Sequence, residues 1–164
     1  MNIFCLDTDI NLSAKYHCDA HVVKMILEYA QLLCTAHRII DNNENETLYK
    51  ATHKNHPCSV WVRDSSANYE YLYILFRNLC DEYTIRYGKI HATDVKLREL
   101  LKEPPKNITQ GGLTALPLCM PDEYKQNDVV SSYRAYYTLE KANKMKLNYT
   151  NANKPYWLNN NYYN

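Results

Sequence analysis

Residues 17 to 36, HCDAHVVKMILEYAQLLCTA, place apolar side chains at intervals of three and four. That spacing is typical of an amphipathic helix, which buries its apolar face against the rest of the protein. The apolar face is broad and consists of Val22, Val23, Ile26, Tyr29, Ala30, Leu33 and Ala36. We predict one long helix from residue 12 to about residue 39, at the centre of a mainly α-helical fold.

The opposite side of this helix carries a narrow polar stripe that consists of His17, His21, Lys24, Glu28, Gln31 and Thr35. One interpretation is a solvent-facing stripe with a Lys24–Glu28 ion pair, which contributes about 0.3 kcal/mol to helix stability. The other is the wall of an active site, because imidazole, amine and carboxylate groups carry out acid–base and nucleophilic chemistry. The helix alone leaves both interpretations open.

The rest of the chain predicts a single compact helical domain over residues 1–147. Residues 2–6, NIFCL, are a short apolar run that fits a strand or a buried extended arm. A second helix is expected to begin at Pro57, and a third to span 67–87 with Gly88 as its C-terminal cap. A shorter helix is expected over 94–103 with Thr93 as its N-cap, and a last helix over 127–147.

Two further segments lack helical periodicity. Residues 104–123 contain two Gly and four Pro and predict a long irregular loop, a feature that is often functional in compact domains. Residues 148–164 predict a polar tail rich in Tyr, Asn and Lys, which packs on the domain or extends from it.

The composition excludes several classes of protein. The 164-residue chain has three Gly, which leave little room for a Gly-rich phosphate loop. It has neither an apolar run of about 18 residues, as a membrane helix needs, nor the pattern of a signal peptide. Six dispersed Cys without a C-x-x-C motif are typical of reduced thiols, so we expect a cytoplasmic protein. The 16 Tyr, with many Asn and Lys, fit a phage-like, AT-rich gene.

The formal net charge of +1 argues against a strongly basic nucleic-acid binder. The charge is uneven, however, because the chain after Glu140 has no acidic residue. There Lys and aromatic residues alternate: Lys141, Lys144, Lys146, Tyr149, Lys154, Tyr156, Trp157, Tyr162 and Tyr163. This segment fits contacts with phosphates and stacking on bases, and it equally fits a polar tail.

Metal binding is one alternative for the histidines. His17 and His21 stand four residues apart, a spacing that zinc ligands use on helices. A third ligand would have to come from His53, His56 or Asp7. Because the sequence has no H-E-x-x-H motif, we expect no metal and no cofactor.

Two polar clusters suggest chemistry on a nucleic acid. Lys24 beside His21 and Glu28 can form a Schiff base with a sugar aldehyde, and Glu28 can move a proton at a ribose oxygen. The second cluster, HKNHP, covers residues 53–57 and precedes a helix N-terminus, which attracts anions. Its alternative is a surface loop whose His caps the helix. We predict phosphate or base contacts from Lys54, Asn55, Arg38 and Arg63.

Five short motifs, in order along the chain, resemble the pyrimidine-dimer DNA glycosylases with AP-lyase activity, which are the phage endonuclease V-type enzymes and their bacterial relatives. Asp19, His21, Val22-Val23 and Glu28 match the phage branch. The bacterial branch is matched by Lys15-Tyr16 after the NIFCL run, by Asn55-His56-Pro57, by Arg86-Tyr87-Gly88, and by the aromatic pairs Tyr136-Tyr137 and Tyr156-Trp157.

The resemblance implies a compact helical domain that binds damaged or modified duplex DNA. It implies that Glu28 is the catalytic carboxylate near the sugar C1′, and that the N-terminal α-amine forms an imino intermediate before β-elimination cuts the strand. Because Asn2 is bulky, we expect the initiator Met1 to stay and to supply this amine, with Lys24 as the alternative. His21 and His56 would orient the substrate.

The sequence departs from the family at two positions. The family has Arg directly before the catalytic Glu and, in the phage branch, a second Arg three residues after it, where this chain has Leu27 and Gln31. These Arg contact substrate, so recognition of the lesion is expected to differ. Two other functions fit the same residues: a nucleotide-directed hydrolase or transferase of phage metabolism, and a non-catalytic nucleotide-binding or inhibitor protein.

Overall fold

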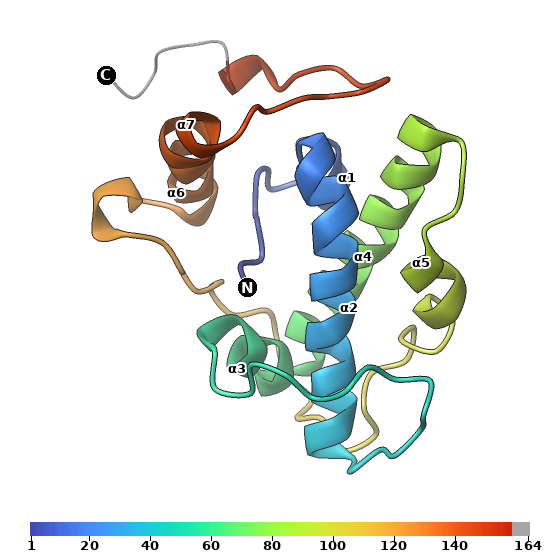
Figure 1. Cartoon of the computed structure of the whole chain (residues 1–164). Coiled ribbons are helices and arrows are strands. Elements are labelled where there is room, and N and C mark those ends of the chain that lie inside the picture. Colours follow the sequence, from blue (N-terminus) through green and yellow to red (C-terminus); the bar gives the residue numbers. More distant parts are fainter. Residues whose placement is uncertain (159–164) are drawn as a thin grey trace.

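Two long helices, α2 (Asp19–Ile40) and α4 (Ser66–Tyr87), pack against each other at the centre of the molecule (Figure 1). The computed structural model describes residues 1–158, and these residues contain no β-strand. The other helices are α1 (Ile10–Lys15), α3 (Pro57–Asp64), α5 (Ala92–Leu97), α6 (Val129–Ala135) and α7 (Ala142–Lys144). The prediction of a mainly α-helical single domain is confirmed.

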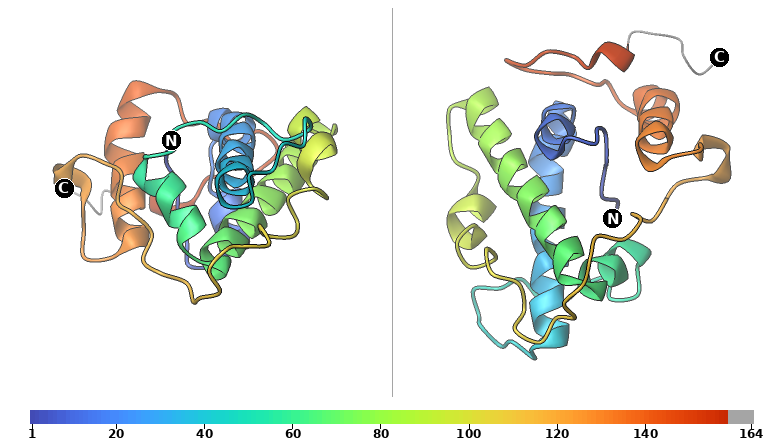
Figure 2. Two further views of the ribbon diagram at one scale, coloured as in Figure 1. Left: turned by 90° about the horizontal axis from the view of Figure 1, so that it is seen from below. Right: turned by 180° about the vertical axis from the view of Figure 1, so that it is seen from behind.

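Three shorter turns complete the helical elements: 3-10 turns at Asp122–Tyr124 and Tyr156–Leu158, and a π-helical stretch, Tyr136–Lys141, between α6 and α7. The long loop at 104–123 is confirmed, since it forms no helix until Asp122. It runs along the start of α4 (Figure 2), where Ser66 donates its backbone N–H to the Thr109 carbonyl at 2.9 Å. Asn68 binds the loop through the backbone N–H of Thr114, also at 2.9 Å.

The single helix predicted from residue 12 to residue 39 is wrong, because the chain turns at Tyr16–Cys18. The helix ends at Lys15 and restarts at Asp19, with Cys18 in an extended conformation. The Cys18 backbone N–H, which a continuous helix would use internally, donates instead to the Tyr137 hydroxyl at 2.9 Å. As a result His17 lies outside α2 and is buried, whereas the sequence pattern placed it on the polar stripe.

Several helix ends follow the sequence signals and one does not. Pro57 is the first residue of α3, and Gly88 ends α4 with a φ of 64°, a left-handed conformation that glycine adopts without strain. The helix predicted over 94–103 corresponds to α5, which spans Ala92–Leu97. Its N-cap is His91 instead of Thr93. The His91 imidazole accepts the Thr93 backbone N–H at 3.1 Å and replaces the expected hydroxyl cap.

The N-terminal run Ile3–Leu6 is a buried extended arm that crosses the helical core. It has no partner strand, so side chains satisfy its backbone. The Leu6 N–H donates to Ser13 Oγ at 2.9 Å, and the Phe4 N–H donates to the Tyr29 hydroxyl at 3.1 Å. The arm is therefore attached to both α1 and α2.

His17 completes this hydrogen-bond chain as a neutral imidazole. Its Nδ1 lies 2.8 Å from the Ser13 carbonyl, which can only accept, so Nδ1 carries the proton. Its Nε2 therefore accepts from the Tyr29 hydroxyl at 2.9 Å, while the same hydroxyl oxygen accepts from Phe4. Full burial lowers the pKa of His17 to about 4.

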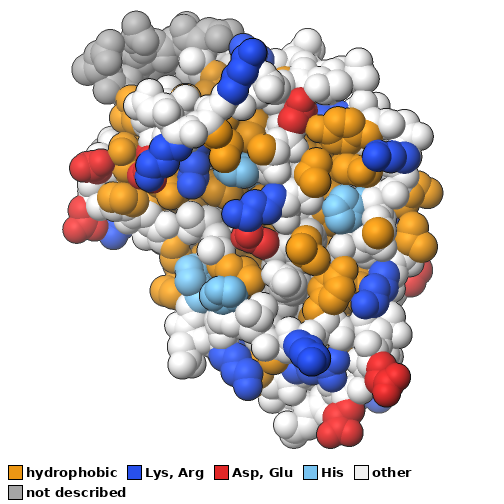
Figure 3. Space-filling model, in the orientation of Figure 1, with side chains coloured by type: hydrophobic (Ala, Val, Ile, Leu, Met, Phe, Trp, Pro, Cys, Tyr) orange, Lys and Arg blue, Asp and Glu red, His pale blue; other side chains and the backbone are white. Residues whose placement is uncertain are grey.

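The surface of one face carries both signs of charge. In Figure 3, which has the orientation of Figure 1, Lys and Arg side chains are scattered over the face, and acidic side chains lie among them and at the edges. Apolar and histidine side chains lie between them. Within the described residues, no helix combines the length and the apolar character that a membrane crossing requires.

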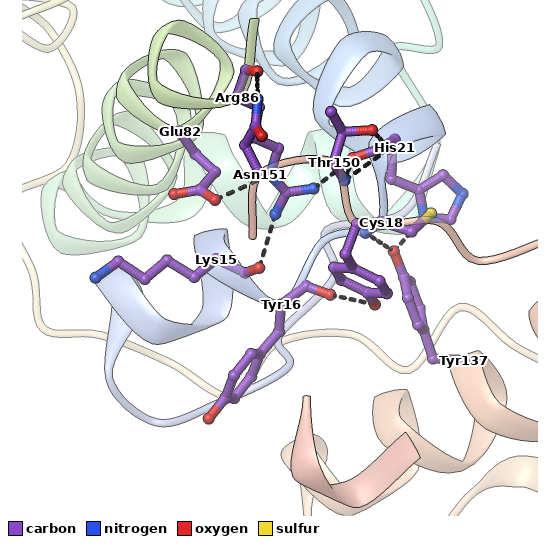
Figure 4. A network of polar contacts seen from close by, with 11 residues as sticks. Lys15, Tyr16, Cys18, His21, Glu82, Arg86, Tyr137, Thr150 and Asn151 are labelled. Carbon is purple, nitrogen blue, oxygen red and sulfur yellow. Dashed lines mark hydrogen bonds and ion pairs between the residues drawn. The ribbon is translucent and has the colours of Figure 1, made fainter. Parts of the chain in front are cut away.

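A buried ion-pair network joins α1, α2, α4 and the C-terminal segment (Figure 4). The Arg86 side chain is fully buried and donates to Glu82 at 2.9 Å, to Asp19 at 3.0 Å and to the Lys15 carbonyl at 2.8 Å. Asp19 also accepts from the Thr150 hydroxyl at 2.6 Å. The network holds the chain turn between α1 and α2 against α4.

Arg86→Met should therefore destabilise the protein strongly. Removal of the guanidinium leaves the buried Glu82 carboxylate without its partner, a change that costs about 3–5 kcal/mol. Urea unfolding at pH 7.5 measures this loss of unfolding free energy. Lys125→Met is the matched control, because the Lys125–Asp122 pair is on the surface and should contribute less than about 1 kcal/mol. Equal effects of the two substitutions would contradict this account.

Candidate active site around the amino terminus

The buried arm carries the amino terminus to the N-terminal end of α3. In Figure 1 the N-terminus lies between α3 and the middle of α2. The positive charge of the Met1 α-amine is near enough to lower the pKa of His56, after the larger effect of burial. It also contributes to the pKa values of Cys58 and Cys119. Met1 and His56, two of the predicted site residues, are thus neighbours.

The arm also relates Met1 to Glu28. The Phe4 ring stacks on His21 of α2, with ring centroids 4.7 Å apart. From His21 to Glu28 the helix rises about 10 Å, and the extended chain from Phe4 back to Met1 spans about the same distance. Met1 lies toward α3, which packs on α2, so the arm runs beside the helix that carries Glu28.

Glu28 and Lys24 form the ion pair that the sequence predicted, with Nζ and Oε1 separated by 3.3 Å. The Lys24 side chain is 65% exposed, whereas the Glu28 side chain is only 17% exposed. A pair with one partner in solvent contributes little to stability, about 1 kcal/mol or less. The Glu28 carboxylate therefore sits at the edge of the protein interior, and Lys24 lies in water beside it.

His21 is buried beneath this surface, with 4% of its area exposed. Burial, followed by the charges of His17, Lys141 and Lys24, lowers the pKa of His21 to about 3. The Tyr137 hydroxyl accepts the Cys18 N–H at 2.9 Å and is also hydrogen-bonded to His21 Nδ1 at 2.8 Å (Figure 4). One ring nitrogen of His21 is therefore already engaged within the protein.

His56 is the N-cap of α3, since its Nδ1 accepts the Cys58 backbone N–H at 3.1 Å. Cys58 is buried in the first turn of α3. Its sulfur lies 3.6 Å from the sulfur of the half-buried Cys119. The hydrogen bond between the two thiols raises the pKa of Cys58 and lowers the pKa of Cys119 to about 7. Cys119 is the more acidic thiol because Cys58 is the deeper, desolvated donor.

The residues predicted to contact nucleic acid lie in the loop before α3, within α3 and near the end of α2. Lys54 and Asn55 are exposed in the loop before α3. Arg63 donates to the Lys54 carbonyl and to Ser59, both at 2.9 Å, and so braces this loop. Arg38 donates to four backbone carbonyls within residues 43–49, so its guanidinium organises the loop after α2.

The aromatic C-terminal segment is mostly engaged in packing. Trp157 is buried, and the Tyr149 hydroxyl donates to the Tyr16 carbonyl at 2.9 Å. Tyr156 is 62% exposed, but its ring faces the Arg134 guanidinium at 5.7 Å and its hydroxyl accepts from Arg134. The other two aromatic residues of the predicted stacking segment, Tyr162 and Tyr163, lie outside the described residues.

The sequence patterns missed three residues that shape the site: Phe4, Tyr137 and Cys119. Phe4 was assigned only to an apolar run, yet its ring covers His21. Tyr137 reaches His21 from a position 116 residues away, and Cys119 reaches Cys58 from 61 residues away. No local pattern marks either contact, because both depend on how the last third of the chain packs.

The first part of the chain thus contains the terminal amine, the partly buried Glu28 carboxylate and the His21 and His56 imidazoles. Residues 1–95 match the family described as pyrimidine dimer DNA glycosylase. The match covers more than half of the chain, and the chain belongs to this family of DNA glycosylases. No curated protein and no solved structure matches it. All nine predicted site residues fall inside the matched segment.

Two of the buried histidines, His17 and His21, predict a pH dependence of stability. Burial lowers their pKa values to about 4 and about 3 in the folded protein, from the ordinary value of 6.5. Between pH 6.5 and 4 the unfolded chain binds more protons, so unfolding free energy falls as the pH falls. We expect a loss of about 2 kcal/mol for each histidine between pH 7.5 and pH 5.

Urea unfolding at the two pH values measures this loss. His21→Gln should reduce the pH dependence by about 2 kcal/mol, whatever it does to absolute stability, and the exposed His53→Gln should leave it unchanged. Identical unfolding free energies at pH 7.5 and pH 5 in the unaltered protein would show that the histidines are not buried in neutral form.

Proposed function

We propose that this protein is a DNA glycosylase and AP lyase that acts on damaged or modified bases, pyrimidine dimers among them, through an amine-derived imine. One observation carries the proposal. Within the segment that matches the family, the buried arm from Phe4 packs on His21 of α2, and the charge of the Met1 amine acts on His56 at the start of α3. This arrangement supports an amine and a carboxylate acting on one sugar.

In the proposed reaction the Met1 α-amine attacks C1′ of the damaged nucleotide, and the base departs with its bonding electron pair. Ring opening then gives an imine between the amine nitrogen and C1′. Glu28 serves as general acid or base: it protonates the sugar ring oxygen and, as a carboxylate, accepts the C2′ proton. Loss of that proton expels the 3′ phosphate by β-elimination, and hydrolysis of the imine restores the amine.

Met1 is a better nucleophile than Lys24 on structural grounds. A lysine becomes a Schiff-base nucleophile near neutral pH when burial or a nearby cation disfavours its ammonium form. The Lys24 side chain is 65% exposed and pairs with a carboxylate, which is the opposite environment. The proposal requires a mature chain that begins at Met1, and intact-mass measurement of the purified protein decides this point.

The surrounding groups are assigned supporting roles. His56 and His21 would orient the sugar and phosphate as neutral imidazoles. The exposed Lys54 and Asn55 lie next to His56 and would contact the DNA backbone. Leu27, 39% exposed, replaces a substrate-binding Arg next to Glu28, so we expect lesion recognition to depend less on charge at this position. The proposed reaction would take place in the compartment that holds the DNA, the cytoplasm of a bacterial host if the gene belongs to a phage.

Borohydride trapping tests the reaction and its nucleophile together. The protein is incubated with UV-irradiated, abasic and untreated duplex DNA, reduced with borohydride and resolved on a denaturing gel. We expect a covalent adduct on the UV-irradiated duplex that is lost in Glu28→Gln, with at least about a 100-fold fall in rate. Glu70→Gln, an exposed carboxylate on α4, is the matched control.

Tryptic digestion of the trapped adduct then identifies the amine. Modification of Met1 gives an adduct on the peptide 1–15, whereas modification of Lys24 blocks cleavage there and gives an adduct on 16–38. Lys24→Arg should trap as well as the unaltered protein. An adduct confined to 16–38 would overturn the assignment of Met1, and no adduct on any duplex would overturn the proposed function.

A second function is favoured by the charge. The formal net charge of +1 is low for a protein that binds duplex DNA, and it fits an enzyme that acts on free nucleotides through the same histidines. Turnover of nucleotides without any reaction on DNA would select this alternative. Nucleotide binding without turnover, unchanged in Glu28→Gln, would select a non-catalytic binding protein.

A further inference from the structure

Three side chains with metal-binding atoms converge beside the amino terminus. They are His56 at the N-cap of α3, Cys58 in the first turn of α3, and Cys119 in the loop that follows α5. Their ligand atoms all lie within 4.8 Å of one another. Among the described residues this is the one group of three or more His, Cys, Asp or Glu with such geometry.

The distances suit a tetrahedral ion better than a disulfide. An ion about 2.3 Å from each of two thiolate sulfurs, at tetrahedral angles, holds the sulfurs about 3.8 Å apart. The Cys58 and Cys119 sulfurs are 3.6 Å apart, whereas a disulfide requires a separation of about 2.0 Å. We propose that His56, Cys58 and Cys119 bind one Zn²⁺ ion, with the fourth position open.

The chemistry of the ligands agrees with this choice of ion. Two thiolates and one imidazole form a borderline-soft set that favours zinc over magnesium or calcium, which prefer oxygen ligands. The same three residues include no carboxylate. Zinc sites with three protein ligands hold water or substrate at the open fourth position, whereas structural zinc sites are closed by four protein ligands.

The site is both held in place and reachable. Cys58 is completely buried and fixed by α3, whereas Cys119 and His56 are partly exposed and open the site to solvent. His56 Nδ1 accepts the Cys58 N–H as a cap, so binding through Nδ1 exchanges this cap for the metal. A single cap hydrogen bond is weak compared with the bonds of a structural or catalytic zinc ion, so the exchange is favourable.

The histidine pair that the sequence suggested as ligands is not available. Both ring nitrogens of His17 are hydrogen-bonded, to Ser13 and to Tyr29. His21 Nδ1 is bonded to Tyr137, and the Phe4 ring covers its face. Metal binding at His17 and His21 would have to break buried contacts of the arm, whereas the His56 site requires only the loss of a cap.

The site has a consequence that rests on the proposed function. The charge of the Met1 amine acts on all three residues, so a bound dication would in turn act electrostatically on the proposed nucleophile. Imine trapping should then decrease on addition of stoichiometric Zn²⁺ and return on chelation. Metal binding itself is measured without DNA, so a failure of the glycosylase proposal does not affect that measurement.

Cobalt substitution tests the metal site directly. The full-length protein, kept reduced with a phosphine and freed of metal, is titrated with Co²⁺, and Zn²⁺ is then added in competition. We expect saturation at one equivalent, with a sulfur-to-cobalt charge-transfer band and the visible bands of tetrahedral cobalt, and displacement of both by Zn²⁺.

Three variants assign the ligands. Cys119→Ala should lower Co²⁺ affinity by about 100-fold or abolish the charge-transfer band. His56→Asn keeps an N-cap oxygen for α3 but removes the imidazole, and it should weaken binding with retention of that band. Cys34→Ala, which removes a buried thiol of α2, is the matched control and should bind as the unaltered protein does.

Three outcomes would overturn the metal proposal. They are the absence of cobalt bands in the reduced protein, identical spectra in Cys119→Ala and Cys34→Ala, and a thiol count showing that Cys58 and Cys119 are joined in a disulfide that re-forms after reduction in the presence of Zn²⁺.

Discussion

The Tyr29 hydroxyl holds the arrangement on which the candidate site depends. The arm Ile3–Leu6 is buried without a partner strand, and each unpaired backbone group there would cost free energy. Tyr29 accepts the Phe4 N–H and donates to His17, whose other nitrogen donates to the Ser13 carbonyl. The arm is therefore held by a continuous chain of buried hydrogen bonds, and the position of Met1 follows from it.

The charge state of the site follows from the same burial. His21 and His56 have lowered pKa values, chiefly because of desolvation, so both rings are neutral near neutral pH. Neutral imidazoles can donate a hydrogen bond to a sugar or phosphate oxygen without adding charge. The affinity for a DNA backbone then depends on the exposed Lys and Arg side chains across the same face (Figure 3).

The sequence predicted the elements that local patterns control. The α4 periodicity, the Gly88 cap, the Pro57 start of α3 and the loop at 104–123 all depend on residues within a few positions of one another. The turn at Tyr16–Cys18 escaped prediction because its cause is Tyr137, more than a hundred residues away. The burial of His21 escaped for the same reason, since Phe4 and Tyr137 cover it.

The candidate site draws on two parts of the chain, and this explains why only some of its residues could be predicted from the sequence. The matched segment, residues 1–95, contains the candidate amine, carboxylate and imidazoles, and their order along the chain carried the resemblance. The later residues hold them in place: Arg134 of α6 donates to the Leu6 carbonyl at 2.8 Å and pairs with Asp7 at 2.7 Å, which fixes the base of the arm.

Cys119 belongs to this later part of the chain and completes the proposed zinc site from outside the matched segment. A chain that keeps residues 1–95 and the Arg134 contacts of the arm but lacks Cys119 would keep the proposed catalytic groups and lose the proposed zinc site. The proposed metal site therefore depends on how the last third of this chain packs against the matched segment.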